Sequence, residues 1–287
     1  MSALPSLYRP VFEPPLCSTH VDLDGIDWRG GMLVRATNWL GDSVMALPGL
    51  YRLHELLPAG VRLYVVAPDK LVAFWQMVPW VERAVGFSGR RLDAAAARAL
   101  RAINPGFGVI LPNSFGSAWD LWRLGVPHRL GRAGEGRAML LHHSLPAHRR
   151  RAGDDRAHQA RLYLEFAAVC GSRAWDASYP RLHAPTGGAG LPEGELLTIA
   201  PGAAYGPAKQ WPAARFREVA RWWSAHVGPV AAVGTAAECE VAAAAVAGVR
   251  GAVNLAGRTS LPELAEVLTR SRCLLANDSG AMHLGAA

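Results

Sequence analysis

Short apolar runs alternate with longer segments of helical periodicity along most of this chain. In the first half, each apolar run is followed by a turn and then by a segment whose apolar residues recur at helical spacing. This alternation is typical of a parallel sheet covered by helices on both faces. The runs predict strands at 32–37, 63–67 and 108–111, and helices at 43–57, 70–77, 93–103 and 117–124.

The same alternation begins again after a loop rich in proline and glycine at 184–194. We take this loop as the boundary between two Rossmann-like domains. The predicted organisation is an N-terminal extension over 1–31, a first domain over 32–185 and a second domain over 186–287. The other segments predict strands at 196–200, 230–233, 252–255 and 273–276, and helices at 158–171, 213–226, 238–246 and 261–270.

The last predicted strand, 273–276, is followed only by a short helical segment at 280–287. A doubly wound sheet normally continues with further pairs of strands and helices. We therefore expect the second domain to be incomplete at its C-terminus.

The composition, 51% hydrophobic and 18% charged, is that of a globular chain with a sizeable core. No run approaches the roughly 18 apolar residues that a membrane span requires, and the N-terminus lacks the pattern of a secretory signal. The cysteines lie apart and have no zinc-binding spacing, which indicates reduced thiols in a cytoplasmic protein and no metal. They are Cys17, Cys170, Cys239 and Cys273.

The formal net charge of +7 favours anionic partners such as nucleotides, phosphorylated glycans or the inner membrane surface. The densest basic stretch, 129–161, lacks the interleaved aromatic residues of a platform that stacks single-stranded bases. We therefore expect no nucleic-acid partner. The arginines of this stretch include Arg132, Arg137, Arg149, Arg150, Arg151 and Arg156.

Chemistry in an open α/β sheet is expected in the turns that follow the strands. Gly41 and Asp42 follow the first strand, and Asp42 is either the N-cap of the next helix or a carboxylate that accepts a proton. Lys209 lies in the loop 201–212, whose small residues allow close approach to a phosphate. That loop is not a Walker motif, since no GxxxxGK[ST] is present.

Two further turns of the second domain offer the same choice between structure and binding. In the segment 276–283, either Asp278 or Ser279 caps a helix, or Ser279 and Gly280 bind an anion such as a diphosphate at its N-terminus. After the strand 230–233, Thr235 and Glu240 suit a ribose or base contact, and equally suit compensation of the helix dipole. No GxGxxG, GxSxG or HExxH motif supports a dinucleotide, hydrolase or metalloprotease site.

Taken together, these turns resemble the motifs of the heptosyltransferase family, glycosyltransferase family 9, whose members add heptose to the inner core of lipopolysaccharide. The similarity runs in order from residue 32 to the last residue. The loop 201–212 is similar to the PGAxxGPAKxWP loop of the members that add the second heptose. The similar segments are 33–48, 111–115 with 125–129, 201–212, 254–261 and 277–283.

The resemblance implies a GT-B enzyme of two Rossmann-like domains facing across a cleft, with the donor held mainly by the second. It implies inverting transfer of heptose from ADP-heptose to a heptosyl-Kdo-lipid A type acceptor, at the inner face of the cytoplasmic membrane. Asp42 would be the general base, and no cofactor or metal would be needed. The residues implied for the donor and its diphosphate are Lys209, Asp278, Ser279, Gly280 and His283, and those for the nucleoside are Thr235 and Glu240.

Two alternatives stay open at this point. One is a family-9 transferase that acts on another glycan, since the contacts to the sugar ring are not readable from the sequence. The other is a non-catalytic chain that binds a nucleotide or a glycan.

Overall fold

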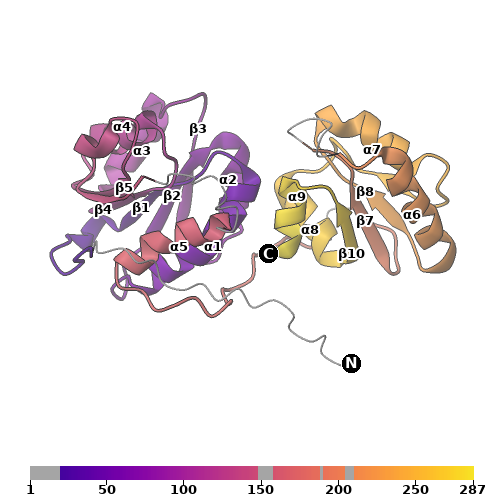
Figure 1. Ribbon diagram of the computed structural model, residues 1–287, viewed down its shortest axis with the longest axis horizontal. Coiled ribbons are helices and arrows are strands. Elements are labelled where there is room, and N and C mark those ends of the chain that lie inside the picture. The colour runs from indigo at the N-terminus through magenta and orange to yellow at the C-terminus, as the bar shows by residue number, and fades with distance from the viewer. Residues whose placement is uncertain (1–19, 148–157, 188–189, 204–209) are drawn as a thin grey trace. The chain divides into compact units, whose positions relative to one another are not determined.

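The computed structural model describes residues 20–147, 158–187, 190–203 and 210–287. These residues form two compact units, each built on a parallel sheet with helices around it (Figure 1). The first unit comprises the described residues up to Asn38 together with Met45–Pro180. The second comprises Trp39–Val44 together with the described residues from Arg181 onward. The predicted α/β class with two Rossmann-like units is confirmed.

The first unit contains a six-stranded sheet in the order β3-β2-β1-β4-β5-β6, with all pairs parallel. Leu33 of the central strand lies beside Tyr64 on one side and Gly108 on the other. The strands are β1 Met32–Arg35, β2 Leu63–Pro68, β3 Arg83–Phe87, β4 Phe107–Ile110, β5 His128–Arg132 and β6 His143–Leu145.

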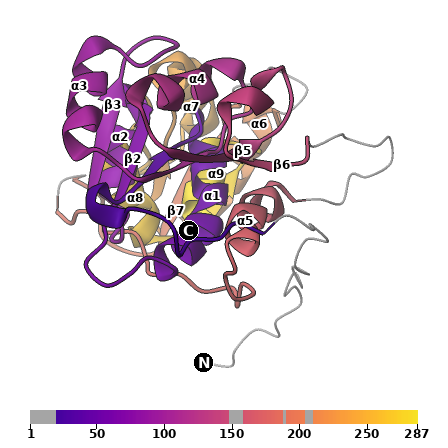
Figure 2. The same cartoon turned by 90° about the vertical axis from the view of Figure 1, so that its left-hand side faces the viewer.

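Helices cover both faces of this sheet, as the alternation predicts. The helices α3 and α4 pack on one face through Leu100 and Leu121, which join a cluster with Leu33 of β1; α1 and α5 lie on the opposite face (Figure 2). Asp93 caps α3, since its carboxylate accepts a hydrogen bond of 2.9 Å from the Ala96 amide. The helices are α1 Leu40–Glu55, α2 Asp69–Gln76, α3 Ala94–Ile103, α4 Phe115–Leu124 and α5 Gln159–Val169, with 3-10 turns η1 Trp28–Gly30 and η2 Arg137–Leu140.

The second unit contains a four-stranded parallel sheet in the order β10-β7-β8-β9. Alternate residues of β7 face opposite sides: Ile199 packs with α6 and α7, and Ala200 packs with Val267 of α8. The strands are β7 Leu196–Ala200, β8 Val230–Ala232, β9 Val253–Asn254 and β10 Ser271–Ala276. The helices are α6 Ala213–His226, α7 Cys239–Val246, α8 Leu261–Arg270 and α9 Gly280–Ala286, with a 3-10 turn η4 Ala236–Glu238.

Several features were not evident from the sequence. The strands β3, β5 and β6 were not predicted. Residues 20–31, which we assigned to an extension, contact the first unit: Val21 and Ile26 are buried, and the Val21 amide donates to the Val169 carbonyl at 2.8 Å. Within the described ranges, no helix has both the length and the apolar character that crossing a bilayer requires.

Candidate active site

Asp42 lies in the first turn of α1, directly after the carboxyl end of β1. The helix begins at Leu40, so Asp42 is not its N-cap, and that alternative is excluded. Among the described residues the Asp42 carboxylate accepts no hydrogen bond, and burial raises its pKa above the ordinary value. A half-buried carboxylate with a raised pKa and no hydrogen-bond donor is well suited to accept a proton.

The turn before Asp42 is shaped by a buried arginine. Arg35, at the end of β1, donates from Nη2 to Asn38 Oδ1 at 3.0 Å, and its guanidinium lies 4.6 Å from the centre of the Phe87 ring. Burial lowers the pKa of Arg35 to about 10, so it remains charged near neutral pH. The Arg35 carbonyl also accepts from the Leu111 amide at 3.1 Å, which holds the ends of β1 and β4 together.

Arg137 holds the loop that follows β4. Its side chain is fully buried, and Nη1 donates to the carbonyls of Pro112 and Ser114. Its Nε donates to the Arg132 carbonyl at 2.7 Å. Arg132 is itself buried and pairs with Glu165 of α5. Arg132 and Arg137 are therefore structural, and these two charges of the basic stretch are not available to the anionic partners that the net charge favours. Arg149, Arg150, Arg151 and Arg156 lie outside the described residues.

In the second unit, Asn277 links two loops at the carboxyl ends of the strands. It directly follows β10 and is 7% exposed. Its Oδ1 accepts a hydrogen bond from the Trp211 amide at 3.0 Å, and its Nδ2 donates to the Pro201 carbonyl at 2.7 Å. Asn277 therefore joins both ends of the loop 201–212 to the start of α9. We had quoted Asn277 within a motif without giving it a role.

The loop after β8 is closed by a capping box. Glu238 Oε2 accepts from the Thr235 amide at 2.7 Å and from the Thr235 hydroxyl at 2.9 Å. A Cβ on Gly202 would lie 2.0 Å from Glu238 Oε1, so this side chain also lies against the loop after β7. Thr235, predicted for the nucleoside, thus has its hydroxyl engaged by Glu238, whereas Glu240 is exposed in the first turn of α7. The spacing Thr-x-x-Glu could have identified Glu238 from the sequence.

The predicted diphosphate residues lie at the start of α9. Ser279 occupies the N-cap position before Gly280, but its hydroxyl makes no capping hydrogen bond. The Ser279 Oγ is buried and has no partner among the described residues. A buried hydroxyl without a hydrogen-bond partner is unusual, and a ligand oxygen that accepts a hydrogen bond from it would explain its position. His283 Nε2 lies 3.8 Å from Asp278 Oδ1, so these two side chains are neighbours.

Lys209, the predicted cation of the diphosphate site, lies outside the described residues. The described ends of its loop are close together, since Gln210 Nε2 lies 3.5 Å from the Ala203 carbonyl. Within the ranges described, no cluster of three or more His, Cys, Asp or Glu side chains could hold a metal ion.

Comparison with protein families gives a match that spans most of the chain. The model of glycosyltransferase family 9 (heptosyltransferase) matches residues 94–287. The chain belongs to glycosyltransferase family 9. It is therefore a glycosyltransferase, and the predicted family and enzyme class are confirmed.

Curated relatives in this family extend the match toward the N-terminus. The chain is 28% identical over 283 residues to lipopolysaccharide heptosyltransferase 2 of Escherichia coli K12, covering 89% of this chain and 79% of the relative. It is 25% identical over 285 residues to lipooligosaccharide heptosyltransferase 2 of Haemophilus ducreyi, with the same coverage.

Solved structures of the family share the fold. The E. coli ADP-heptose lipopolysaccharide heptosyltransferase II matches with a TM-score of 0.73 at 28% identity, covering 90% of this chain and 82% of that one. A family 9 glycosyltransferase from Veillonella parvula matches with a TM-score of 0.76 at 21% identity, covering 91% of this chain and 78% of that one, and shows the fold alone. The predicted GT-B class is confirmed by these neighbours.

Proposed function

We propose that this family 9 member transfers heptose from ADP-heptose to the inner core of lipopolysaccharide, on an acceptor of the heptosyl-Kdo-lipid A type. The observation that carries the proposal is the 28% identity to E. coli lipopolysaccharide heptosyltransferase 2 across 89% of the chain. The aligned solved structure of similar identity is named for ADP-heptose as donor. The raised pKa of Asp42 adds independent support for acid–base chemistry at the start of α1.

In the proposed reaction Asp42 acts as the general base. Its carboxylate accepts the proton of an acceptor hydroxyl while the hydroxyl oxygen forms a bond to the anomeric carbon of heptose. The bond between that carbon and the ADP oxygen breaks, and its electron pair leaves with ADP, so the anomeric configuration inverts. Burial supports this role because a carboxylate with a raised pKa is a stronger base at the pH of the cell.

The second unit would hold the donor. Lys209 and the amides of Ser279 and Gly280 would stabilise the negative charge that develops on departing ADP. The Ser279 hydroxyl, which has no partner among the described residues, is available to donate to a phosphate oxygen. Asp278 and His283 would complete the diphosphate site.

The nucleoside would lie against the turn after β8. Glu240 would contact it directly. The Thr235 hydroxyl already donates to Glu238 in the capping box. Thr235 would therefore support the nucleoside site by holding the shape of this turn.

We propose that transfer takes place at the inner face of the cytoplasmic membrane. A lipid A acceptor is anchored by its acyl chains, so the enzyme has to reach its sugars at the membrane surface. A peripheral contact would be sufficient for this.

The test is a product assay with purified protein, ADP-heptose and a heptosyl-Kdo-lipid A acceptor. Mass spectrometry should detect ADP and an acceptor heavier by one heptose. Asp42→Asn should slow transfer about 10²–10⁴-fold, as expected when a general base is lost. Asp69→Asn is the matched control, since Asp69 lies in the first turn of α2 after β2 of the same sheet and should have no effect.

Two other outcomes would replace the proposal. Turnover of a different acceptor, with none of the lipopolysaccharide core, would indicate a family 9 transferase for another glycan. Binding of ADP-heptose without turnover of any acceptor would indicate a non-catalytic binding protein.

A further inference from the structure

A pocket of about 880 Å³ opens in the first unit, at the end of the sheet opposite Asp42. It is lined by the last turn of α1 and the two leucines after it, by Pro79 and Trp80 before β3, and by Ser172, Arg173 and Pro180. At about 1.5 Å per helical residue, Arg52 of this pocket lies about 15 Å from Asp42 along α1. The pocket is therefore separate from the residues proposed for transfer.

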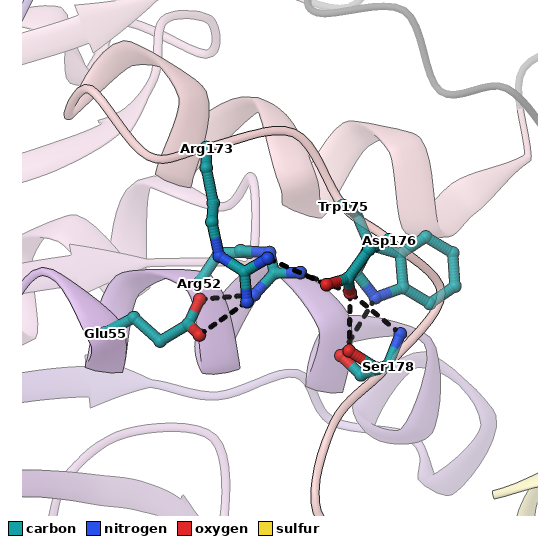
Figure 3. A network of polar contacts seen from close by, with 6 residues as sticks. All are labelled: Arg52, Glu55, Arg173, Trp175, Asp176 and Ser178. Atoms are coloured by element: carbon teal, nitrogen blue, oxygen red, sulfur yellow. Dashed lines mark hydrogen bonds and ion pairs between the residues drawn. The ribbon is translucent and has the colours of Figure 1, made fainter.

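One side of the pocket is a network of balanced charges (Figure 3). Arg52 is fully buried and pairs with Glu55 and, at 2.5 Å, with Asp176. Arg173 pairs with the same two carboxylates, at 2.9 Å from Glu55 and 2.7 Å from Asp176. Hydrogen bonds from Ser178 and Arg173 hold the pKa of Asp176 well below its usual range, so this carboxylate remains charged. Two cations therefore face two anions.

The other side of the pocket is aromatic. The Tyr51 ring stacks on the His54 ring, with centroids 6.3 Å apart and planes at 15°. Tyr51 also contacts Trp80 at 5.1 Å between centroids, and Trp80 is in turn contacted edge-on by Tyr179. Trp80 is buried and Tyr51 is half-buried, so Tyr51 presents the more accessible ring.

We propose that this pocket binds a neutral saccharide. Sugar hydroxyls both donate and accept hydrogen bonds, so they can contact guanidinium and carboxylate groups alike without separating the ion pairs. The C–H faces of a sugar ring also pack on an aromatic ring. A phosphorylated ligand is disfavoured because both lining arginines, Arg52 and Arg173, are already paired with carboxylates. The volume lies within the range of roughly 300–1,000 Å³ that is usual for ligand pockets.

The test is a saturation-transfer NMR titration of the full chain with maltotriose, cellotriose and lactose as neutral probes and glucose 6-phosphate as the anionic probe. At least one neutral probe should bind, and Tyr51→Ala should weaken its affinity about tenfold through loss of the stacking face. Trp222→Ala is the matched control, because Trp222 on α6 also stacks on a histidine, His226, but does not line this pocket. It should leave the affinity unchanged.

Three results would overturn the proposal: no binding of any neutral probe, equal loss in Tyr51→Ala and Trp222→Ala, or tighter binding of glucose 6-phosphate that Arg173→Gln abolishes. If Tyr51→Ala does not unfold cooperatively, and so is not properly folded, His54→Ala replaces it in the test. It removes the stacked ring while leaving the contact between Tyr51 and Trp80. Its loss of affinity should be smaller than tenfold but measurable, and an unchanged affinity would contradict the site.

Discussion

The two units bury charge in different ways. Among the described residues, the first unit buries five arginines and the second buries none. The buried polar residues in the described part of the second unit are instead Ser43, Thr198, Glu266 and Asn277. The five arginines are Arg35, Arg52, Arg129, Arg132 and Arg137.

The arginines of the first unit mainly serve backbone carbonyls of irregular segments. Arg129 donates to the carbonyls of Leu140 and Val126, and Arg137 donates to those of Pro112, Ser114 and Arg132. A guanidinium has five N–H donors, so one side chain can satisfy several carbonyls that no strand or helix pairs. A basic sequence therefore does not by itself indicate a basic surface, and the net charge of +7 overstates what is available to an anionic partner.

The largest effect is expected at Arg137. Replacement by alanine leaves three carbonyls without this donor, at about 1–3 kcal/mol each where they are buried. We expect Arg137→Ala to destabilise the first unit by about 3 kcal/mol or more, measured by urea denaturation. Arg123→Ala, at an exposed position of α4, should stay within about 0.5 kcal/mol of wild type. Equal losses of unfolding free energy in the two variants would contradict the view that buried arginines stabilise the first unit more than exposed ones do.

The next contrast is between two thiols. Cys170 is buried in the first unit, which raises the pKa of its thiol to about 12, whereas Cys273 is exposed on the edge strand β10. Since the thiolate is the reactive form, iodoacetamide at pH 8 should alkylate Cys273 at least about 100-fold faster than Cys170. Peptide mass spectrometry over time measures both. Comparable rates would show that the first core is more open than we describe.

In the second unit, Asn277 holds a loop in the way that buried arginines do in the first unit. Asn277→Ala removes both hydrogen bonds to the loop 201–212 and should cost about 1–3 kcal/mol. Hydrogen exchange should increase at the Trp211 amide. Asn254→Ala is the matched control, because the Asn254 side chain accepts a hydrogen bond within its own turn, from the Ala256 amide at 3.0 Å, and has no bond to the loop 201–212 in the part of the chain that the structure describes. Equal protection of Trp211 in both variants would contradict the linking role.

The smallest effect is expected at the helix caps. Ser260 forms a reciprocal capping box with Glu263 at the start of α8, whereas Ser114 of the first unit caps α4 without a glutamate partner. Ser260→Ala should cost about 1 kcal/mol in thermal denaturation. Ser114→Ala should cost less. The reverse order would show that the reciprocal bond adds nothing here.

Much of the second unit could be predicted from the sequence, because its signals are local. The helices at 213–226 and 261–270 have the predicted bounds, helped by Pro212 before the first and the Ser260 box before the second. In the first unit, β5 was missed because Arg129 and Arg132 are polar in the sequence but buried in the sheet. Strand patterns that count arginine as a surface residue fail at such positions.

The part of the candidate site that rests on local sequence signals could also be predicted. Asp42 was identified from its place after a strand, which is a local feature. Asn277 was not assigned a role because its partners, Pro201 and Trp211, are far from it in the chain and meet it only in the folded sheet.

The central claim is a division of labour, with the base, Asp42, at the start of α1 and the donor site in the loops that follow β7, β8 and β10. Calorimetry of ADP binding, performed beside the transfer assay on Asp42→Asn and Lys209→Ala, tests it most directly. We predict that Asp42→Asn keeps an ADP affinity within about twofold of wild type while transfer falls about 10²–10⁴-fold, and that Lys209→Ala weakens ADP binding about tenfold or more. Equal loss of ADP binding and transfer in Asp42→Asn, or unchanged ADP affinity in Lys209→Ala, would contradict the account.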